Sequence, residues 1–205
     1  MITDPVVVDV SQDWAVACDV QERFMEVPCA GTHALTCSAR CRQLRALGGD
    51  CFDFLPLPGR RVALAVADAS GKGLPAALII ANVQSSRGKP PATLVLIDGP
   101  VHNGDGSITW LEAVAPPVGM FADTIYNATE VQLNPADLIV AYTDGIVEAA
   151  NRAGDEWGVD GLLGAIAACR SPRPDRIVHS ALVALDAFSA GGQTDDATIL
   201  AAIVN

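Results

Sequence analysis

The sequence predicts an α+β fold in which strands and helices occur in groups rather than in strict alternation. Two observations support this class. Predicted strands occur early, in the middle and at the end of the 205-residue chain, and predicted helices are grouped between them. Half of the residues are hydrophobic and 18% are charged, which provides for a large core and argues against a disordered chain. The grouping favours a sandwich over a doubly wound parallel sheet.

In the N-terminal half, the first predicted element is a serine-capped helix over about 12–25. Residues 34–42 alternate between apolar and polar types, as expected of a half-buried strand, and the apolar run 61–67 predicts a second strand. A helix is then predicted over Leu74–Gln84, because Pro75 suits the first turn of a helix.

The C-terminal half is predicted to hold short strands, then two helices and a closing strand. Turns rich in Gly, Asp, Asn and Pro separate the short strands. One apolar stripe marks the second helix as packed against a core. The predicted strands are 92–97, 108–113, 126–133, 138–142 and 197–204, and the predicted helices are 159–169 and 174–189.

The charge of the chain excludes two classes of partner. Thirteen basic against 24 acidic residues give a net charge of −11 and a pI near 4.5. Nucleic acids and anionic membranes require clustered Lys and Arg, so we expect neither as a partner. Between Pro90 and Asn151 there is no Lys or Arg, and we interpret the acids there, apart from Asp144, as solvated surface. They are Asp98, Asp105, Glu112, Asp123, Glu130, Asp137, Asp144 and Glu148.

The cysteines and the N-terminus predict a cytoplasmic protein. None of the six cysteines forms a C-x-x-C pair, and we expect reduced, mostly buried thiols. The N-terminal residues lack the pattern of a secretory signal, and no apolar run is long enough for a membrane span.

Four segments place an aspartate at the end of an apolar strand or in a glycine-containing turn, namely 48–53, 68–73, 142–145 and 194–198. Such carboxylates can converge at one edge of a sandwich. Two like charges about 4 Å apart repel by roughly 4 kcal/mol at an effective dielectric of 20, so a cluster of them requires cations. Oxygen ligands favour Mg²⁺ or Mn²⁺, and two such ions can activate water and hold a phosphoryl group. The pattern predicts metal-assisted hydrolysis of a phosphate ester.

These segments, in this order, resemble the PPM-type (type 2C) metal-dependent serine/threonine protein phosphatases. Within that family they are similar to the bacterial branch of the stage II sporulation phosphatase and the sigma-factor-regulating phosphatases. The resemblance covers roughly residues 19–204 and is most specific over 48–79, 142–158 and 194–200. It implies a single phosphatase domain over 1–205, folded as an α-β-β-α four-layer sandwich of two antiparallel sheets flanked by helices.

The resemblance also implies a site for two Mn²⁺ or Mg²⁺ ions. Asp50 and Asp68 would be the catalytic acids, with Asp68 bridging the ions and positioning the attacking water. The implied metal ligands are Asp50, Asp68, the carbonyl of Ala69, Asp144 and Asp195.

The neighbouring residues have more ordinary interpretations. Asp196 is expected to be a nearby acid rather than a ligand, and Asp53 and Glu148 to be surface acids or acids behind the ligands. Gly71 and Gly73 would allow a tight backbone turn over the site.

The implied activity is hydrolysis of phosphoserine and phosphothreonine by a metal-bridged water. By resemblance, the phosphorylated substrate protein is an anti-anti-sigma-type regulator in bacterial partner-switching signalling. One alternative is a catalytically impaired, phosphatase-like module that binds and sequesters a regulatory partner. A further alternative is a hydrolase acting on small phosphate esters.

One departure from the family bears on these alternatives. After the Leu74–Gln84 helix the family continues with a hairpin, whereas here Arg87 to Pro91 leads directly into the next strand, so a hairpin is expected to be missing. A trimmed sheet exposes an edge that a partner or a second copy of the chain could cover, which predicts a possible homodimer.

Overall fold

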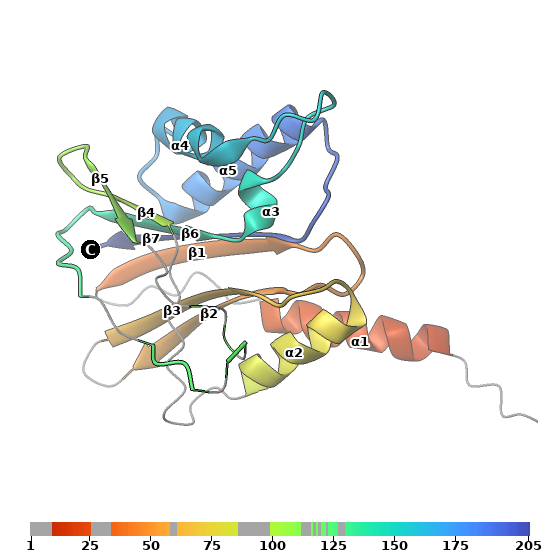
Figure 1. Cartoon of the computed structure of the whole chain (residues 1–205). Helices are drawn as coiled ribbons and strands as arrows, with labels where there is room; N and C mark the ends of the chain where they lie inside the picture. Colours follow the sequence, from red (N-terminus) through yellow and green to blue (C-terminus); the bar gives the residue numbers. More distant parts are fainter. Residues whose placement is uncertain are drawn as a thin grey trace, which may run out of the picture.

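The computed structural model describes residues 10–25, 34–57, 61–85, 99–111, 116, 118, 120–121, 123–126 and 130–205. It confirms the α+β class and the four-layer arrangement, with two antiparallel sheets stacked between two groups of helices (Figure 1). All strand pairs in the described part of the chain are antiparallel.

The first sheet has five strands in the order β1-β7-β6-β4-β5. The closing strand β7 lies near its centre and pairs with β1 on one side and β6 on the other. Its strands are β1 (Leu35–Arg42), β4 (Gly99–His102), β5 (Ile108–Leu111), β6 (Leu138–Tyr142) and β7 (Ala197–Val204). The second sheet, within the described residues, consists of β2 (Asp50–Leu57) and β3 (Arg61–Asp68).

The helices form the two outer layers (Figure 1). One layer lies on the two-stranded sheet and holds α1 (Val10–Met25) and α2 (Leu74–Ser85). The other lies on the five-stranded sheet and holds α3 (Asp144–Val147), α4 (Gly158–Ala168) and α5 (Pro174–Ser189). No helix in the described part of the chain is long and apolar enough to span a membrane.

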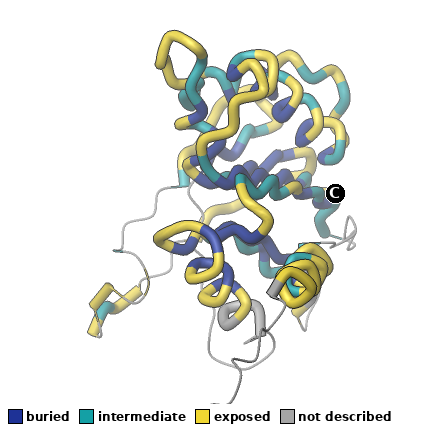
Figure 2. The backbone as a smooth tube through the Cα atoms, turned by 90° about the vertical axis from the view of Figure 1, so that its right-hand side faces the viewer, coloured by how far each residue is buried: buried dark blue, intermediate teal, exposed yellow. Residues whose placement is uncertain are grey.

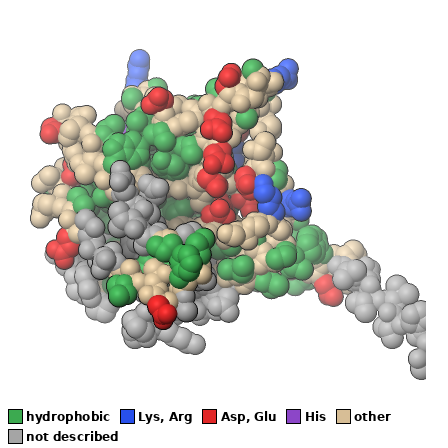
Figure 3. All heavy atoms as spheres, in the orientation of Figure 1, with side chains coloured by type: hydrophobic (Ala, Val, Ile, Leu, Met, Phe, Trp, Pro, Cys, Tyr) green, Lys and Arg blue, Asp and Glu red, His purple; other side chains and the backbone are tan. Residues whose placement is uncertain are grey.

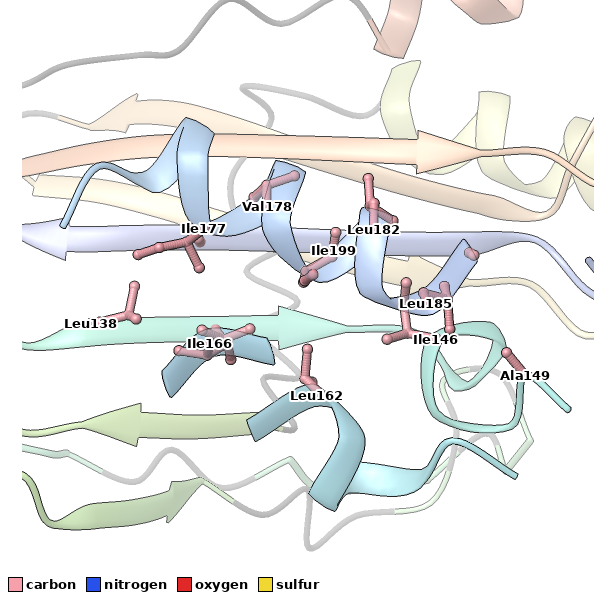
Figure 4. Close-up of a cluster of buried hydrophobic side chains, with 14 residues drawn as sticks. Leu138, Ile146, Ala149, Leu162, Ile166, Ile177, Val178, Leu182, Leu185 and Ile199 are labelled. Atoms are coloured by element: carbon pink, nitrogen blue, oxygen red, sulfur yellow. The ribbon is translucent and has the colours of Figure 1, made fainter. Parts of the chain in front are cut away.

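Three apolar clusters fill the spaces between the four layers. The largest lies between the five-stranded sheet and α4 and α5, where the predicted stripe of α5 contributes Ile177, Val178 and Leu182 (Figure 4). A second cluster, including Phe52 and Leu200, fills the space between the sheets, and a smaller one lies under α2. The buried residues are accordingly concentrated in the sheets, and the outer faces of the helices are exposed (Figure 2).

The two-residue period of the strands decides which polar side chains enter the space between the sheets. In β7, Ala197, Ile199 and Ala201 face the helices, whereas Leu200 and Ala202 face the second sheet. Thr198 shares this inward face and lies at the end of the strand, where the sandwich opens. The same alternation in β2 turns Asp50 inward together with Phe52 and Phe54.

The strands of the structure differ from the predicted ones in one place, one strand was not predicted, and one prediction stands untested. β2 is a strand of eight residues where the sequence pattern predicts none. The predicted strand 126–133 is wrong for the residues that the structure describes. The next strand along the chain, β6, is already paired with β4 on one side and β7 on the other, so it offers this segment no free edge. The predicted strand 92–97 lies outside the described residues, and Gly99, expected just after it, is the first residue of β4.

Asp137 contradicts its surface interpretation. Its side chain is buried and accepts hydrogen bonds from the backbone N–H groups of Asn134 and Gly104. It therefore joins the turn before β6 to the β4–β5 turn, and its role is to satisfy buried donors.

Candidate metal centre

Asp50 and Asp68 face each other at one end of the two-stranded sheet. Antiparallel pairing places the first residue of β2 directly opposite the last residue of β3. Burial raises the pKa of Asp50, and the two carboxyl groups lie close enough for the charge of Asp68 to raise it further. The sequence predicted that the motif carboxylates converge at one edge of the sandwich, and the register of β2 and β3 explains how these two acids meet.

The surroundings of Asp50 are buried and polar. Its Oδ2 accepts hydrogen bonds of 2.7 Å from the hydroxyls of both Thr143 and Thr198, which reach it from the opposite sheet. Burial raises the pKa of Asp50 to about 7, although the hydrogen bonds from Thr198 and Thr143 act in the opposite direction. The Asp50 carboxyl therefore takes up a proton readily when no cation neutralises its charge.

Asp68 lies at the exposed mouth of the same site. The surrounding protein removes enough water from its carboxyl to raise its pKa to about 6, and the negative charges of Asp144, Asp195 and Asp196 add to this effect. The four motif acids therefore act on one another electrostatically. Acidic side chains gather on this part of the surface, next to Lys and Arg side chains (Figure 3).

Lys72 supplies a cation to this acidic group. Its Nζ lies 2.5 Å from Oδ2 of Asp195, and the two side chains are 45% and 40% exposed. Gly71 and Gly73, with φ angles of 105° and 70°, give the turn that carries Lys72 a backbone shape that other residues rarely adopt. The predicted tight turn at these glycines is confirmed, and its consequence is that Lys72 reaches Asp195.

Ala69, the implied backbone ligand, is buried directly after Asp68. Its N–H donates to the carbonyl of Gly49, at 2.9 Å, which ties the end of β3 to the start of β2. A side chain on Gly49 would come within 2.9 Å of the Ala69 carbonyl oxygen. The glycine therefore leaves room for this carbonyl beside the two strand ends.

Both carboxylate oxygens of Asp196 accept hydrogen bonds from the backbone. Its Oδ1 accepts from the N–H of Leu44 and its Oδ2 from the N–H of Gly49, both at 2.7 Å. The side chain is buried. Both oxygens are thus used to hold the loop that leads into Asp50, and Asp196 anchors this loop to the start of β7.

A second polar contact holds the same loop from the side of α1. The side-chain amide of Gln21 donates to the carbonyl of Gly48, at 2.8 Å, and accepts from its N–H, at 3.1 Å. The amide is buried, so the pair satisfies two backbone groups that would otherwise lack partners. The position of α1 is therefore linked to the loop before Asp50.

The donor set fits a hard divalent cation in its chemistry, since every side-chain candidate offers carboxylate oxygen. In the described residues, however, no three acids, histidines or cysteines are arranged to hold an ion without rearrangement. Two features described above are consistent with this: the pKa values of Asp50 and Asp68 are raised, which favours their protonated forms, and Lys72 holds Asp195. Binding of an ion therefore favours the loss of protons from Asp50 and Asp68 and requires the displacement of Lys72 from Asp195.

Other predictions near the site have mixed outcomes. Glu148 is exposed, as expected of a surface acid, whereas Asp53 is buried within β2 and is not a surface residue. A pocket of about 220 Å³ lies next to the acids, between α3, α5 and the loop before β7, and none of the five implied ligands lines it. Sequence reasoning missed Thr143 and Thr198, although each is a hydroxyl residue close to a motif aspartate.

The comparison with protein families identifies one match. The model described as stage II sporulation protein E (SpoIIE) matches residues 83–205, which is more than half of the chain. This region contains Asp144 and Asp195, and the region before it contains Asp50 and Asp68. No curated protein matches the chain in sequence.

Solved structures share the fold at low sequence identity. The SiaA-PP2C domain of Pseudomonas aeruginosa is 16% identical, with a TM-score of 0.72, over 94% of this chain and 95% of that one. A structure of RsbU and RsbW domains from Mycobacterium tuberculosis is 23% identical, with a TM-score of 0.67, over 85% of this chain and 61% of that one. The SpoIIE phosphatase domain of Bacillus subtilis is 14% identical, with a TM-score of 0.58, over 86% and 95%.

Proposed function

Because the chain belongs to the stage II sporulation protein E (SpoIIE) family and has the PP2C phosphatase fold, we propose that it is a Mg²⁺- or Mn²⁺-dependent phosphoprotein phosphatase. The proposed reaction is the hydrolysis of phosphoserine and phosphothreonine. The proposed catalytic domain is a single phosphatase domain over residues 1–205. The observation that carries the proposal is the pairing of Asp50 with Asp68 beside Asp144 and Asp195.

The proposed ligands are Asp50, Asp68, the Ala69 carbonyl, Asp144 and Asp195. A solved structure of RsbX in complex with magnesium supports the choice of ion, since it shares this fold with a TM-score of 0.57 at 11% identity. When bound, such ions neutralise phosphoryl charge and lower the pKa of a water. The chain's own contribution is to hold the acids at one end of the two sheets and to place Lys72 next to them.

Turnover assays test the activity. We expect hydrolysis of p-nitrophenyl phosphate and of a phosphoserine protein with Mn²⁺, and none with excess chelator. Asp68→Asn should abolish turnover in both assays. Glu148→Gln is the matched control, because Glu148 is an exposed acid near Asp144 for which no ligand role is proposed.

A folded protein that binds Mn²⁺ but hydrolyses neither substrate would contradict the proposal. It would favour the alternative of a phosphatase-like module that sequesters a partner. The expected missing hairpin is the feature behind that alternative, and segment 86–98, where the loss is expected, lies outside the described residues.

We further propose a phosphorylated anti-anti-sigma-type regulator as the substrate. The fold shared with the RsbU-domain structure and with RsbX supports this choice. Faster dephosphorylation of such a regulator than of an unrelated phosphoserine protein would bear it out, and equal rates would contradict it. We also propose a cytoplasmic location, because none of the six cysteines stands in a C-x-x-C pair. Self-association stays a prediction, which sedimentation analysis tests.

A further inference from the structure

Two threonines hold one oxygen of Asp50 from the opposite sheet. The hydroxyls of Thr143 and Thr198 both donate to Oδ2 of Asp50, at 2.7 Å each. Neither threonine belongs to the two-stranded sheet: Thr143 lies between β6 and α3, and Thr198 lies in β7. The contact therefore crosses between the sheets at the end where the acids gather.

The direction of the Thr143 hydrogen bond is fixed by the other partner of its hydroxyl. Thr143 Oγ1 accepts from the backbone N–H of Thr198, at 2.9 Å, so its own proton is directed to Asp50. Thr198 is fully buried, and its hydroxyl donates to the same oxygen of Asp50. The two protons that reach Oδ2 thus come from side chains that the fold holds in place.

The threonine contact joins three segments that carry implied ligands. Asp50 begins β2, Thr143 directly precedes Asp144, and Thr198 follows Asp195 within the same short segment. The hydroxyls thus hold the Asp50 carboxyl in a set orientation relative to the segments of the other acids. With Oδ2 held twice, Oδ1 is the oxygen left for a shared cation.

We propose that Thr143 and Thr198 are positioning residues that orient Asp50 for the metal ion and so set the affinity of the site. This inference rests on the proposed function, because it assumes that Asp50 is a metal ligand. A purely structural role, in which the hydroxyls only satisfy a buried carboxyl, makes a different prediction for metal binding.

Isosteric substitution separates the two roles. Thr143→Val and Thr198→Val keep the shape and remove the hydroxyl, whereas the corresponding serine variants keep the hydroxyl and remove the methyl group. We expect each valine variant to bind Mn²⁺ about 10- to 100-fold more weakly in calorimetric titration, as is usual when a ligand loses its orienting hydrogen bond. The serine variants should bind close to wild type.

Thr36→Val is the matched control. Thr36 lies in β1 and donates to the Asn205 side chain, near the opposite end of β7 from Thr198. Circular dichroism and thermal unfolding in chelator check that each variant is folded. If Thr198→Val does not fold, Thr143→Val carries the test, because Thr143 lies outside the central strand.

Each outcome bears on the proposal. Valine variants that bind Mn²⁺ as tightly as wild type, or serine variants as weak as valine, would overturn it while leaving the proposed function intact. Valine variants that do not fold while the serine variants do would assign the hydroxyls a purely structural role. A wild-type protein that binds no Mn²⁺ would overturn this inference and the proposed function together.

Discussion

Asp50 lies directly opposite Asp68 across the β2–β3 pair, and burial raises the pKa of both carboxyl groups. The pairing of the two acids disfavours their charged forms and also suits the binding of a cation. Burial and neighbouring charge disfavour ionisation of either acid, and the same arrangement offers two oxygens to a cation that can replace a proton. The stability of the fold and the binding of metal are therefore linked through pH.

The first prediction concerns this link. The pKa of Asp50 is about 7 in the folded protein, above its usual value of 3.8, so the folded state binds more protons than the unfolded state between these values. The free energy of unfolding of the metal-free protein should thus fall as pH rises through this window. Thermal unfolding in chelator measures the change, and Asp50→Asn should show a flatter dependence.

Added Mn²⁺ should reverse this trend. Because the ion displaces protons from Asp50 and Asp68, the rise in melting temperature caused by Mn²⁺ should grow between about pH 6 and about pH 8. A rise that is equal at both pH values would show that these carboxyls do not bind the ion.

The second prediction concerns Lys72, which now holds Asp195. An ion that binds Asp195 must compete with the ammonium group, so Lys72→Met should strengthen Mn²⁺ binding by about three- to tenfold. Isothermal titration measures the affinity. Lys72→Arg keeps the charge and should resemble wild type, and stability in chelator should change little because exposed ion pairs contribute little. Weaker binding by Lys72→Met would contradict the competition.

Much of the fold could be predicted because the relevant signals are local. The apolar stripe of α5 and the alternation of β1 follow from the periods of a helix and a strand, and both are confirmed. β2 was missed because two aspartates and a proline break its apolar pattern. Its strand structure depends on pairing with β3, which no local pattern reports.

The site was predictable in part for the same reason. Asp50, Asp68, Asp144 and Asp195 stand in recognisable motifs, and the structure brings their charges into one group. The threonines on Asp50 depend on the register between β1, β7 and β6 and on the stacking of the sheets. Contacts of this kind, like the burial of Asp137, arise from tertiary structure and have no signature in the local sequence.

The third prediction separates the adjacent acids Asp195 and Asp196. Asp196→Ala removes the acceptors of two backbone N–H groups and should lower the free energy of unfolding by about 2–4 kcal/mol. Asp195→Ala loses a partly exposed contact with Lys72 and should leave stability in chelator nearly unchanged while weakening Mn²⁺ binding. Urea unfolding and titration measure the two effects. The reverse pattern would mean that Asp196 is the ligand and Asp195 the anchor.

The last prediction concerns the close approach of Gly145 to the loop before β7. A Cβ at this position would overlap the carbonyl oxygen of Asp196, which is backbone and has no side-chain freedom to move aside. Gly145→Ala should therefore lower the free energy of unfolding by on the order of 3 kcal/mol, and it should weaken Mn²⁺ binding because Asp144 and Asp195 flank the contact.

Gly164→Ala provides the contrast for Gly145→Ala. Gly164 lies inside α4, and no atom lies within 4 Å of the position that a Cβ would take. Because alanine favours a helix interior over glycine, this variant should raise the free energy of unfolding by about 0.5–1 kcal/mol and leave Mn²⁺ affinity unchanged. Urea unfolding of both variants measures the difference. Equal stability of the two would show that the loop can withdraw from Gly145 and that the packing of α3 against Asp196 does not hold the acids in place.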